Sequence, residues 1–252
     1  MSNPFDLTGK VALVTGANTG IGQGIALALA NAGADIAAVD IVPLDETKGL
    51  VEAAGRRFLG LSADLTSIAP VTGLVEETVA VLGRLDILVN NAGTIRRADA
   101  VDFSEADWDL VMNLNLKSVF FLCQAFGRHC IGQGQKGKII NIASMLSFQG
   151  GIRVPSYTAS KSGVAGITKL LANEWAGKGI NVNALAPGYV ATNNTAALRA
   201  DAQRSAEILG RIPAGRWSEP ADLGGPAVFL ASDAADYVHG TILPVDGGWL
   251  AR

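Results

Sequence analysis

The segment Thr15-Gly16-Ala17-Asn18-Thr19-Gly20-Ile21-Gly22 joins an apolar run at residues 10–15 (KVALVT) to an Ala/Leu-rich stretch at residues 21–32. The run is typical of a buried strand, and the stretch is typical of a helix that stops at Gly33. Glycines between the two let the backbone approach a pyrophosphate, and the helix start offers free N–H groups and the positive end of its dipole. The spacing is T-G-x-x-x-G-x-G and not the more familiar G-x-G-x-x-G, so the turn alone is a weak signal for a dinucleotide site.

The rest of the chain repeats this alternation of strand and helix. Further strands are expected at residues 35–40, 58–63, 85–90, 138–143, 180–186 and 241–245, and helices at residues 44–54, 67–82, 104–132, 155–177, 196–209 and 220–232. Nearly continuous apolar strands separated by helices indicate a parallel sheet that is covered on both faces. We therefore expect the α/β class: one Rossmann-type domain over residues 1–252, with a doubly wound sheet of about seven parallel strands flanked by helices.

Residues 188–213 are the least strand-like insertion and are rich in Thr, Asn and Arg. They follow the carboxyl end of a predicted strand, which is the edge where ligands bind in open α/β sheets. We expect this segment to form a substrate lid.

Composition limits the possible functions. The 252 residues carry a net charge of −3, with 49% apolar and 17% charged residues, which suits one large domain. No basic stripe is visible, so no nucleic-acid partner is expected. Cys123 and Cys130 stand about 10 Å apart on one helical stretch, too far for a disulfide, and are expected to be buried thiols. His129 and His239 are too few and too scattered for a zinc site, so no metal is expected.

We expect neither a signal peptide nor a membrane span in this chain. Its N-terminus lacks the basic and apolar segments of a signal peptide. No apolar run approaches the ~20 residues of a membrane span, because Asn, Asp, Lys or Gly breaks each run within a few residues. We expect a cytoplasmic enzyme without a membrane partner.

Asp40 ends the second predicted strand, 18 residues after Gly22. At this position a carboxylate accepts hydrogen bonds from the hydroxyls of an adenosine ribose. The carboxylate would also repel a 2′-phosphate, since two like charges ~4 Å apart cost about 4 kcal/mol at an effective dielectric constant near 20. No Arg or Lys directly follows Asp40, so the sequence predicts NAD(H) as the cofactor rather than NADP(H).

Three polar residues suit proton transfer. Tyr157 and Lys161 are four residues apart in a predicted helix and share one of its faces, and Ser144 follows a predicted strand. A free phenol has a pKa of about 10. A nearby ammonium and a positive nicotinamide favour the phenolate, so we expect the pKa of Tyr157 to be lowered. A Tyr and a Lys at this spacing are most often coincidental when nothing else accompanies them.

Here they belong to a series of motifs that runs from end to end. The series is T-G-x-x-x-G-I-G at residues 15–22, Asp64-Leu65, N-N-A-G at residues 90–93, Asn115, Ser144, Y-x-A-S-K at residues 157–161, P-G-x-x-x-T at residues 187–192 and Asp246-Gly247-Gly248. The whole chain resembles the short-chain dehydrogenase/reductase family of the standard short type, and no catalytic position departs from its pattern. The resemblance implies an NAD-dependent oxidoreductase that moves a hydride between the nicotinamide and a secondary alcohol or its ketone.

The resemblance also implies residue roles. Tyr157 is the general acid for ketone reduction and the general base for alcohol oxidation, and Lys161 lowers its pKa and holds the nicotinamide ribose. Ser144 steadies the substrate oxygen as charge develops, and Asn115 positions a water that links Lys161 to solvent. The implied cofactor contacts are Gly16, Asn18, Thr19, Gly20, Ile21, Gly22, Asp40, Asp64, Leu65, Asn91, Ala92, Gly93, Tyr157, Lys161, Pro187, Gly188, Val190 and Thr192.

The segments between the motifs are similar to one branch of the family, the dehydrogenases of deoxy sugar acids formed in pectin and alginate breakdown. A sugar-acid substrate needs a cation for its carboxylate, and amides or hydroxyls for its own hydroxyls. The candidate substrate residues are Ser144, Tyr157, Arg96, Arg97, Arg153, Gln149, Asn193 and Asn194. The arginines could instead pair with Asp99 or Asp102 at the surface, and Met145 and Trp217 are expected to pack.

Two other functions stay open. The first is reduction of another substrate, a polyol or a 3-ketoacyl thioester, although acyl-carrier reductases usually prefer NADP(H), which Asp40 opposes. The second is a non-catalytic dinucleotide sensor, since a fold alone never establishes function. The resemblance further implies a homotetramer built from the helices at residues 107–132 and 157–177 and from the C-terminal strand.

Overall fold

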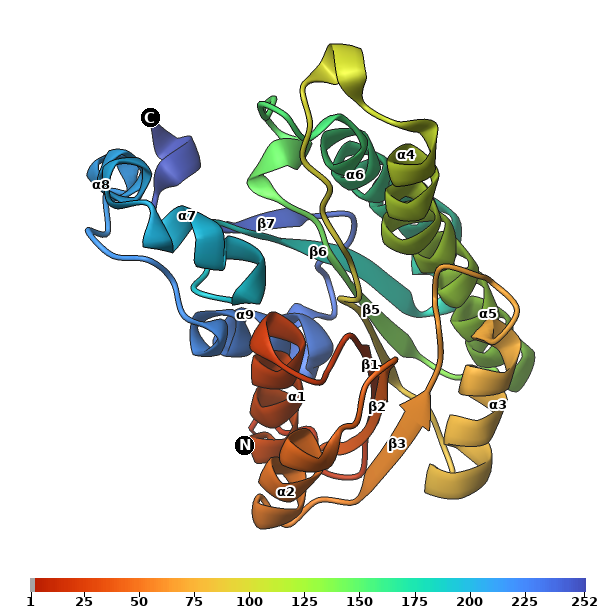
Figure 1. Cartoon of the computed structure of the whole chain (residues 1–252). Helices are drawn as coiled ribbons and strands as arrows, with labels where there is room; N and C mark the ends of the chain where they lie inside the picture. The colour runs from red at the N-terminus through yellow and green to blue at the C-terminus, as the bar shows by residue number, and fades with distance from the viewer. Residues whose placement is uncertain (1–2) are drawn as a thin grey trace.

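Seven parallel strands form one sheet in the order β3-β2-β1-β4-β5-β6-β7 in the computed structural model, which describes residues 3–252 (Figure 1). Their bounds are β1 Val11–Thr15, β2 Asp35–Asp40, β3 Phe58–Ser62, β4 Ile87–Asn90, β5 Gly137–Ile142, β6 Ile180–Pro187 and β7 Ile242–Val245. All neighbouring pairs are parallel. The predicted α/β class with a doubly wound parallel sheet is confirmed.

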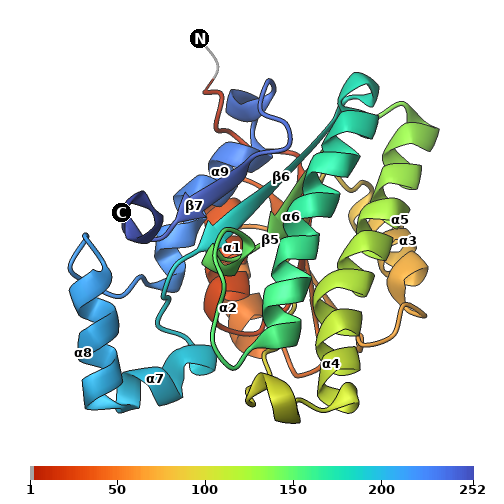
Figure 2. The same ribbon diagram turned by 90° about the horizontal axis from the view of Figure 1, so that it is seen from above.

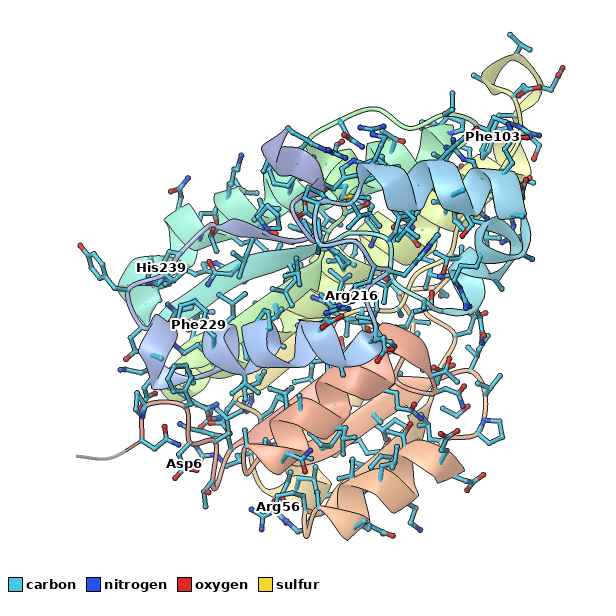
Figure 3. All side chains as sticks on the ribbon, turned by 90° about the vertical axis from the view of Figure 1, so that its left-hand side faces the viewer. Asp6, Arg56, Phe103, Arg216, Phe229 and His239 are labelled. Atoms are coloured by element: carbon cyan, nitrogen blue, oxygen red, sulfur yellow. The ribbon has the colours of Figure 1, made fainter. Side chains whose placement is uncertain are left out.

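Helices cover both faces of the sheet, as Figures 1 and 3 show. Their bounds are α1 Gly20–Asn31, α2 Asp45–Ala53, α3 Val71–Leu82, α4 Glu105–Met112, α5 Ser118–Gln133, α6 Pro155–Trp175, α7 Ala196–Ala200, α8 Ala202–Arg211 and α9 Gly224–Ala231. Val11 and Leu13 of β1 pack with α3, α5 and α6, whereas Ala12 and Val14 pack with α1, α2 and α9. Alternate residues of one strand therefore serve two cores, which is why its sequence is apolar without interruption.

The strand order reverses between β1 and β4, and this reversal places the site. Asp86, just before β4, accepts the backbone N–H of Val11 at 2.9 Å and fixes the start of β1 beside it. The carboxyl ends of both strands, Thr15 and Asn90, then lie at the same edge of the sheet. In open α/β sheets, ligands bind in the crevice outside such a switch point.

The structure shifts some predicted boundaries. Residues 67–70 precede α3, because Pro70 lacks an N–H and caps the helix. The helix predicted at residues 196–209 is two helices, because Asp201 has an extended backbone and its carboxylate caps α8 by accepting the N–H of Arg204. The long helix predicted at residues 104–132 contains a π-helical segment, Asn113–Lys117, and such bulges commonly occur at functional sites.

The combined helix from Glu105 to Gln133 has the length and mean hydropathy of a membrane span. The sequence predicts no such span because Asn113, Asn115 and Lys117 interrupt the apolar run. In the fold this helix packs on the sheet and on its neighbours, and it contributes Val119, Leu122 and Phe126 to one core. Cys123 and Cys130 of this helix are buried free thiols, as predicted, and burial raises the pKa of both to about 12.

Candidate active site

The turn between β1 and α1 has the shape of a phosphate cradle. Gly16 has φ 64°, and a Cβ there would lie 2.8 Å from Ala92 Cα. A Cβ on Gly22 would lie 2.0 Å from the Gly16 carbonyl oxygen, so both positions admit only glycine. Thr19, the N-cap of α1, makes no side-chain hydrogen bond to the helix. The first N–H groups of α1 are therefore available to an anion.

The N-N-A-G segment ties the ends of β1 and β4 together. Thr15 Oγ1 accepts the backbone N–H groups of Asn91 and Ala92, each at 3.0 Å. The Asn91 amide donates to the carbonyls of Thr15 and Gly16, both at 2.9 Å. Thr15 and Asn91 thus hold the cradle and the neighbouring strand end in one rigid unit.

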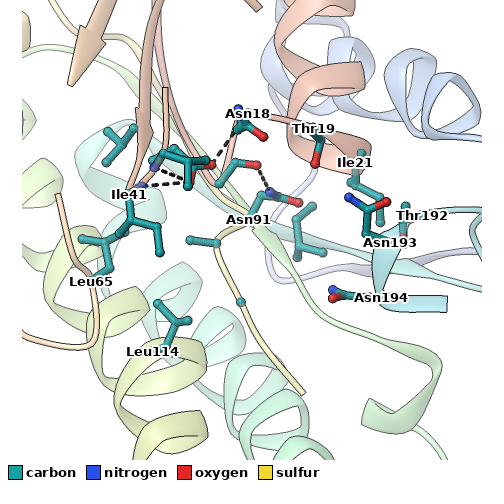
Figure 4. Close-up of a pocket in the computed structure, with 18 of the residues that line it drawn as sticks. Asn18, Thr19, Ile21, Ile41, Leu65, Asn91, Leu114, Thr192, Asn193 and Asn194 are labelled. Atoms are coloured by element: carbon teal, nitrogen blue, oxygen red, sulfur yellow. Dashed lines mark hydrogen bonds between the residues drawn. The ribbon is translucent and has the colours of Figure 1, made fainter. Parts of the chain in front are cut away.

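A cavity of about 470 Å³ lies over this unit (Figure 4). Fourteen of the predicted cofactor residues line it: Gly16, Asn18, Thr19, Gly20, Ile21, Asp40, Asp64, Leu65, Asn91, Ala92, Gly93, Tyr157, Lys161 and Thr192. Gly22 and Val190 are buried outside the lining, Pro187 ends β6, and Gly188 lines a second cavity. The cradle, the free helix start and the volume fit a dinucleotide.

Other residues of this lining carry no sequence motif. They are Val39, Ile41, Val42, Ala63, Thr66, Leu114, Ile142, Asn193 and Asn194. Most are apolar or follow a strand end, so only their place at the carboxyl edge of the sheet distinguishes them. Asn193, a predicted substrate residue, lies here rather than in the second cavity.

Asp40 lies at the end of β2 and is held by the loops around it. Its Oδ2 accepts the backbone N–H of Asn18 at 3.1 Å. Its Oδ1 accepts those of Ile41 at 2.8 Å and Val42 at 3.4 Å. The carboxylate is thus fixed in the cavity wall, next to the glycine-rich turn.

The proton-transfer set lies where the two cavities meet. Tyr157 and Lys161 project from the first half of α6, and Tyr157 lines both cavities. Lys161 is buried, its Nζ donates to the Ile142 carbonyl at 2.6 Å, and it lies 5.7 Å from the centroid of the Tyr157 ring. Ser144 follows β5, and its Oγ accepts the N–H of Leu146 at 3.1 Å.

The pKa of Tyr157 differs from the sequence prediction. Burial raises it above the ordinary value of 10, while a hydrogen bond with Ser144 and the charge of Arg97 act in the opposite direction. The predicted net lowering of this pKa is wrong for this structure, because burial outweighs the groups near the ring that favour the phenolate. Burial also lowers the pKa of Lys161, to about 8. The protein alone therefore keeps the phenol protonated near neutral pH.

The raised pKa of Tyr157 predicts that the rate of alcohol oxidation depends on pH. A phenol with a raised pKa is almost entirely protonated at pH 7, and alcohol oxidation needs the phenolate, so kcat/KM for oxidation should rise about tenfold per pH unit from pH 7 to 8. Ketone reduction needs the protonated phenol and should stay nearly constant over the same interval. Initial rates in both directions in a constant-ionic-strength buffer series test this. A flat oxidative profile between pH 6 and 9 would contradict it.

Asn115 lies in the π-helical segment and is fully buried. Its Oδ1 accepts the N–H of Thr94 at 2.9 Å, and its Nδ2 donates to the Thr94 carbonyl at 2.8 Å. A weaker contact of 3.4 Å joins Nδ2 to Ser160 Oγ on α6. Asn115 thus fixes the chain after N-N-A-G against α6, while its predicted part in a water relay stays a prediction.

A second cavity of about 490 Å³ adjoins Tyr157. Of the predicted substrate residues, Ser144, Tyr157, Arg97, Gln149 and Asn194 line it. Two of the predicted arginines do not. Arg96 pairs with Asp107 at 3.2 Å, and Arg153, with φ 64°, pairs with Asp99 at 3.1 Å on the surface. Arg97 is therefore the predicted arginine that this cavity contains.

The second cavity also has residues that no motif indicated. They come from the loop after Ser144, from the segment predicted as a lid and from the C-terminus, and include Met145, Ile152, Tyr189, Leu198, Arg204, Glu207, Ile208, Arg211 and Trp249. Met145 and Trp217 pack in a small core with Ile208, Ile212 and Trp249, which confirms their expected packing. α7 and α8 of the predicted lid thus form part of the cavity wall.

Proton transfer at one end of a dinucleotide-sized cleft defines a nicotinamide-dependent oxidoreductase that acts on CH–OH groups. A family model described as enoyl-(acyl carrier protein) reductase matches residues 16–250. The chain belongs to the short-chain dehydrogenase/reductase family, and the resemblance inferred from the motifs is confirmed.

Two relatives are similar over nearly the whole chain. The 2-dehydro-3-deoxy-D-gluconate 5-dehydrogenase of Escherichia coli strain K12 is 68% identical over 98% of both chains. The enzyme of the same name from Dickeya dadantii strain 3937 is 67% identical over 99% of both. A crystal structure from Agrobacterium tumefaciens, assigned as a 2-deoxy-D-gluconate 3-dehydrogenase and containing NADP, has a TM-score of 0.95 and 60% identity over 100% of both chains.

Proposed function

We propose that the protein is an NAD-dependent dehydrogenase of deoxy sugar acids, which interconverts the C5 hydroxyl and C5 ketone of 2-dehydro-3-deoxy-D-gluconate. The observation that carries the substrate is the 68% identity to the Escherichia coli enzyme of that name over 98% of both chains. The second cavity supports it, because Arg97, Gln149 and Asn194 offer a cation and amides beside Tyr157.

The chemistry follows from the site. When bound, the nicotinamide supplies the hydride acceptor for oxidation or the hydride donor for reduction. In oxidation, the Tyr157 oxygen takes the hydroxyl proton while the C–H bond breaks, so one proton and one hydride leave the alcohol and a ketone remains. In reduction, Tyr157 returns the proton to the developing alkoxide. Ser144 Oγ donates to the same substrate oxygen and stabilises its charge in both directions.

Charges near Tyr157 adjust its proton affinity. Lys161 is buried beside the ring, and its ammonium favours the phenolate over the phenol while it remains charged. Arg97 acts in the same sense, since its charge lowers the pKa of Tyr157 against the effect of burial. Lys161, which lines the first cavity, and Arg97, which lines the second, therefore both favour proton abstraction by Tyr157.

The choice of NAD(H) is part of the proposal, and Asp40 supports it. Its carboxylate is fixed in the wall of the first cavity by three backbone N–H groups. A charge held in place cannot move away from a 2′-phosphate, whereas it can accept hydrogen bonds from a 2′-hydroxyl. Because the related structure from Agrobacterium tumefaciens contains NADP, the preference for NAD⁺ over NADP⁺ is to be measured directly.

We expect turnover of deoxy sugar acids with NAD⁺. Initial rates at 340 nm would be compared for 2-dehydro-3-deoxy-D-gluconate, 2-deoxy-D-gluconate, D-gluconate, threitol and an acetoacetyl thioester, with the last assayed as reduction. The deoxy sugar acids should give kcat/KM at least about tenfold above threitol and the thioester, because their carboxylate and hydroxyls can each find partners in the second cavity. Turnover of only threitol or the thioester would support the oxidoreductase activity but refute the sugar acid as the substrate.

The non-catalytic sensor is excluded, since the family and the named relatives make the chain an oxidoreductase. A homotetramer, a cytoplasmic location, a role in pectin breakdown, and the absence of nucleic-acid and membrane partners stay predictions.

A further inference from the structure

The second cavity has one wall that the catalytic residues do not build. This wall consists of four residues of α8 and one of the C-terminal turn η8 (Trp249–Ala251): Arg204, Glu207, Ile208, Arg211 and Trp249. α8 and the C-terminal turn lie side by side (Figures 1 and 2), and Arg252 donates to the Gly210 carbonyl at 3.1 Å. The wall is therefore held together by contacts between distant parts of the sequence.

The two arginines of this wall differ in what already compensates their charge. Arg204 Nη1 lies 3.0 Å from Glu207 Oε2 in an ion pair. Arg211 has neither an ion pair nor a side-chain hydrogen bond to any of residues 3–252, and its guanidinium lies 4.0 Å from the Trp249 ring centroid. A guanidinium always carries its charge and offers five donors. Arg211 therefore presents an uncompensated cation to the cavity.

Trp249 is a rigid support for this cation. It is 4% exposed and packs edge-on against Tyr189, with ring centroids 4.9 Å apart. Its Nε1 has no acceptor among the described residues, so a phenyl ring would fill the position without an unpaired donor. What the indole provides here is the stronger cation–π contact, and it fixes a long side chain that would otherwise be flexible.

Arg97, the other uncompensated cation of the cavity, lies at the reacting end. It donates to the Asn194 carbonyl at 3.3 Å, and its charge acts on Tyr157, whereas Arg211 lies on the wall that α8 and the C-terminal turn form. In the proposed substrate the carboxylate is at C1 and the reacting hydroxyl at C5. Four C–C bonds of ~1.5 Å separate these carbons, a span of about 5 Å. A cation away from Tyr157 is therefore needed for the carboxylate.

We infer that Arg211 binds the substrate carboxylate and that Trp249 positions its guanidinium for this contact. The inference rests on the proposed function and names the residue that makes the site specific for an acid. Arg211 forms charge-assisted hydrogen bonds with the carboxylate, which are stronger than neutral ones. Trp249 is argued to act through the guanidinium that it contacts, so it is a positioning residue.

The test compares two methionine variants of the same helix, Arg211→Met and Arg204→Met. Arg211→Met should lower kcat/KM for 2-deoxy-D-gluconate by about 10- to 100-fold, chiefly through KM, because a charged hydrogen bond is lost. Arg204→Met should lower kcat/KM at least about threefold less than Arg211→Met does, because the charge of Arg204 is already compensated by Glu207. Arg211→Lys, which keeps the charge, should recover part of the loss, and Trp249→Phe should raise KM less than Arg211→Met does.

A binding measurement separates this inference from the proposed function. Calorimetry with the enzyme–NADH complex would use D-gluconate and its uncharged counterpart D-glucitol. Arg211→Met should weaken D-gluconate binding by about 10- to 100-fold and leave D-glucitol binding unchanged. Equal weakening of both ligands, equal effects of Arg211→Met and Arg204→Met, or no D-gluconate binding by the wild type would overturn the role of Arg211. A wild type that binds D-gluconate but oxidises no sugar acid would overturn the proposed substrate alone.

Discussion

Tyr157→Phe is expected to lower kcat by about 10²–10⁴-fold, the usual contribution of a positioned acid–base group. The substitution removes one oxygen, which is the atom that exchanges a proton with the substrate. The ring still fills the junction of the two cavities, so the fold and NADH binding should persist. Rates at saturating substrate, NADH fluorescence titration and a thermal melt measure the three quantities on one preparation.

Tyr189→Phe is the matched control for this variant. Tyr189 also lines the second cavity, and its ring packs against Trp217 and Trp249. Loss of its hydroxyl should change kcat less than about threefold, since it is not placed for proton transfer. If Tyr157→Phe retained more than a tenth of the wild-type kcat, another group would carry the proton. If both variants lost activity equally, a general disturbance of the cavity would explain the loss.

The sheet and the cofactor side were predictable because their signals are local. Strands buried on both faces read as unbroken apolar runs, as β1 does. The turn after β1 and the residues at the ends of β2 and β4 lie at one edge by topology alone. Fourteen predicted cofactor residues therefore share one cavity, although Gly22 acts from outside it, as the position where a Cβ would collide with the Gly16 carbonyl.

The substrate side was only partly predictable because it depends on non-local contacts. Arg96, Arg97 and Arg153 look alike in the sequence, yet only Arg97 lines the second cavity, and the others pair with Asp107 and Asp99. Arg153 has a left-handed backbone conformation, which residues other than glycine rarely adopt. The sequence therefore gives no indication of it. Arg211 reaches the cavity because α8 packs against the C-terminal turn, and no motif or periodicity encodes that contact.

The direction in which the pKa of Tyr157 shifts also depends on non-local contacts and could not be predicted from the sequence. The i, i+4 spacing correctly places Lys161 on the same side of α6 as Tyr157, 5.7 Å from its ring centroid. The spacing does not reveal that the ammonium donates to the Ile142 carbonyl, or that burial outweighs the nearby positive charge. Desolvation depends on the whole surrounding structure, so its magnitude is not available from a motif.

Asp40→Asn is expected to narrow the preference for NAD⁺ over NADP⁺, measured as the ratio of kcat/KM values, by about 100-fold or more. Two like charges ~4 Å apart repel by about 4 kcal/mol at an effective dielectric constant near 20, which corresponds to ~10³-fold before screening by salt. Asparagine keeps the size of the side chain and removes the charge. It also replaces one accepting oxygen by an amide NH₂ group, so the N–H of Asn18 or of Ile41 loses its acceptor and becomes free to bind a phosphate oxygen.

Asp64→Asn is the control, because Asp64 is a second carboxylate in the lining of the same cavity. Its Oδ1 accepts the N–H of Thr66 at 2.9 Å, and by the family resemblance it lies near the adenine and not the ribose 2′-position. Its substitution should leave the NAD⁺/NADP⁺ ratio within about threefold of the wild-type value. A wild type that prefers NADP⁺ would refute the proposed cofactor, since the fixed charge of Asp40 then does not face the 2′-phosphate. An unchanged ratio in Asp40→Asn, together with a wild-type preference for NAD⁺, would move the source of discrimination to the exposed segment after β2, where Ile41 and Val42 line the cavity.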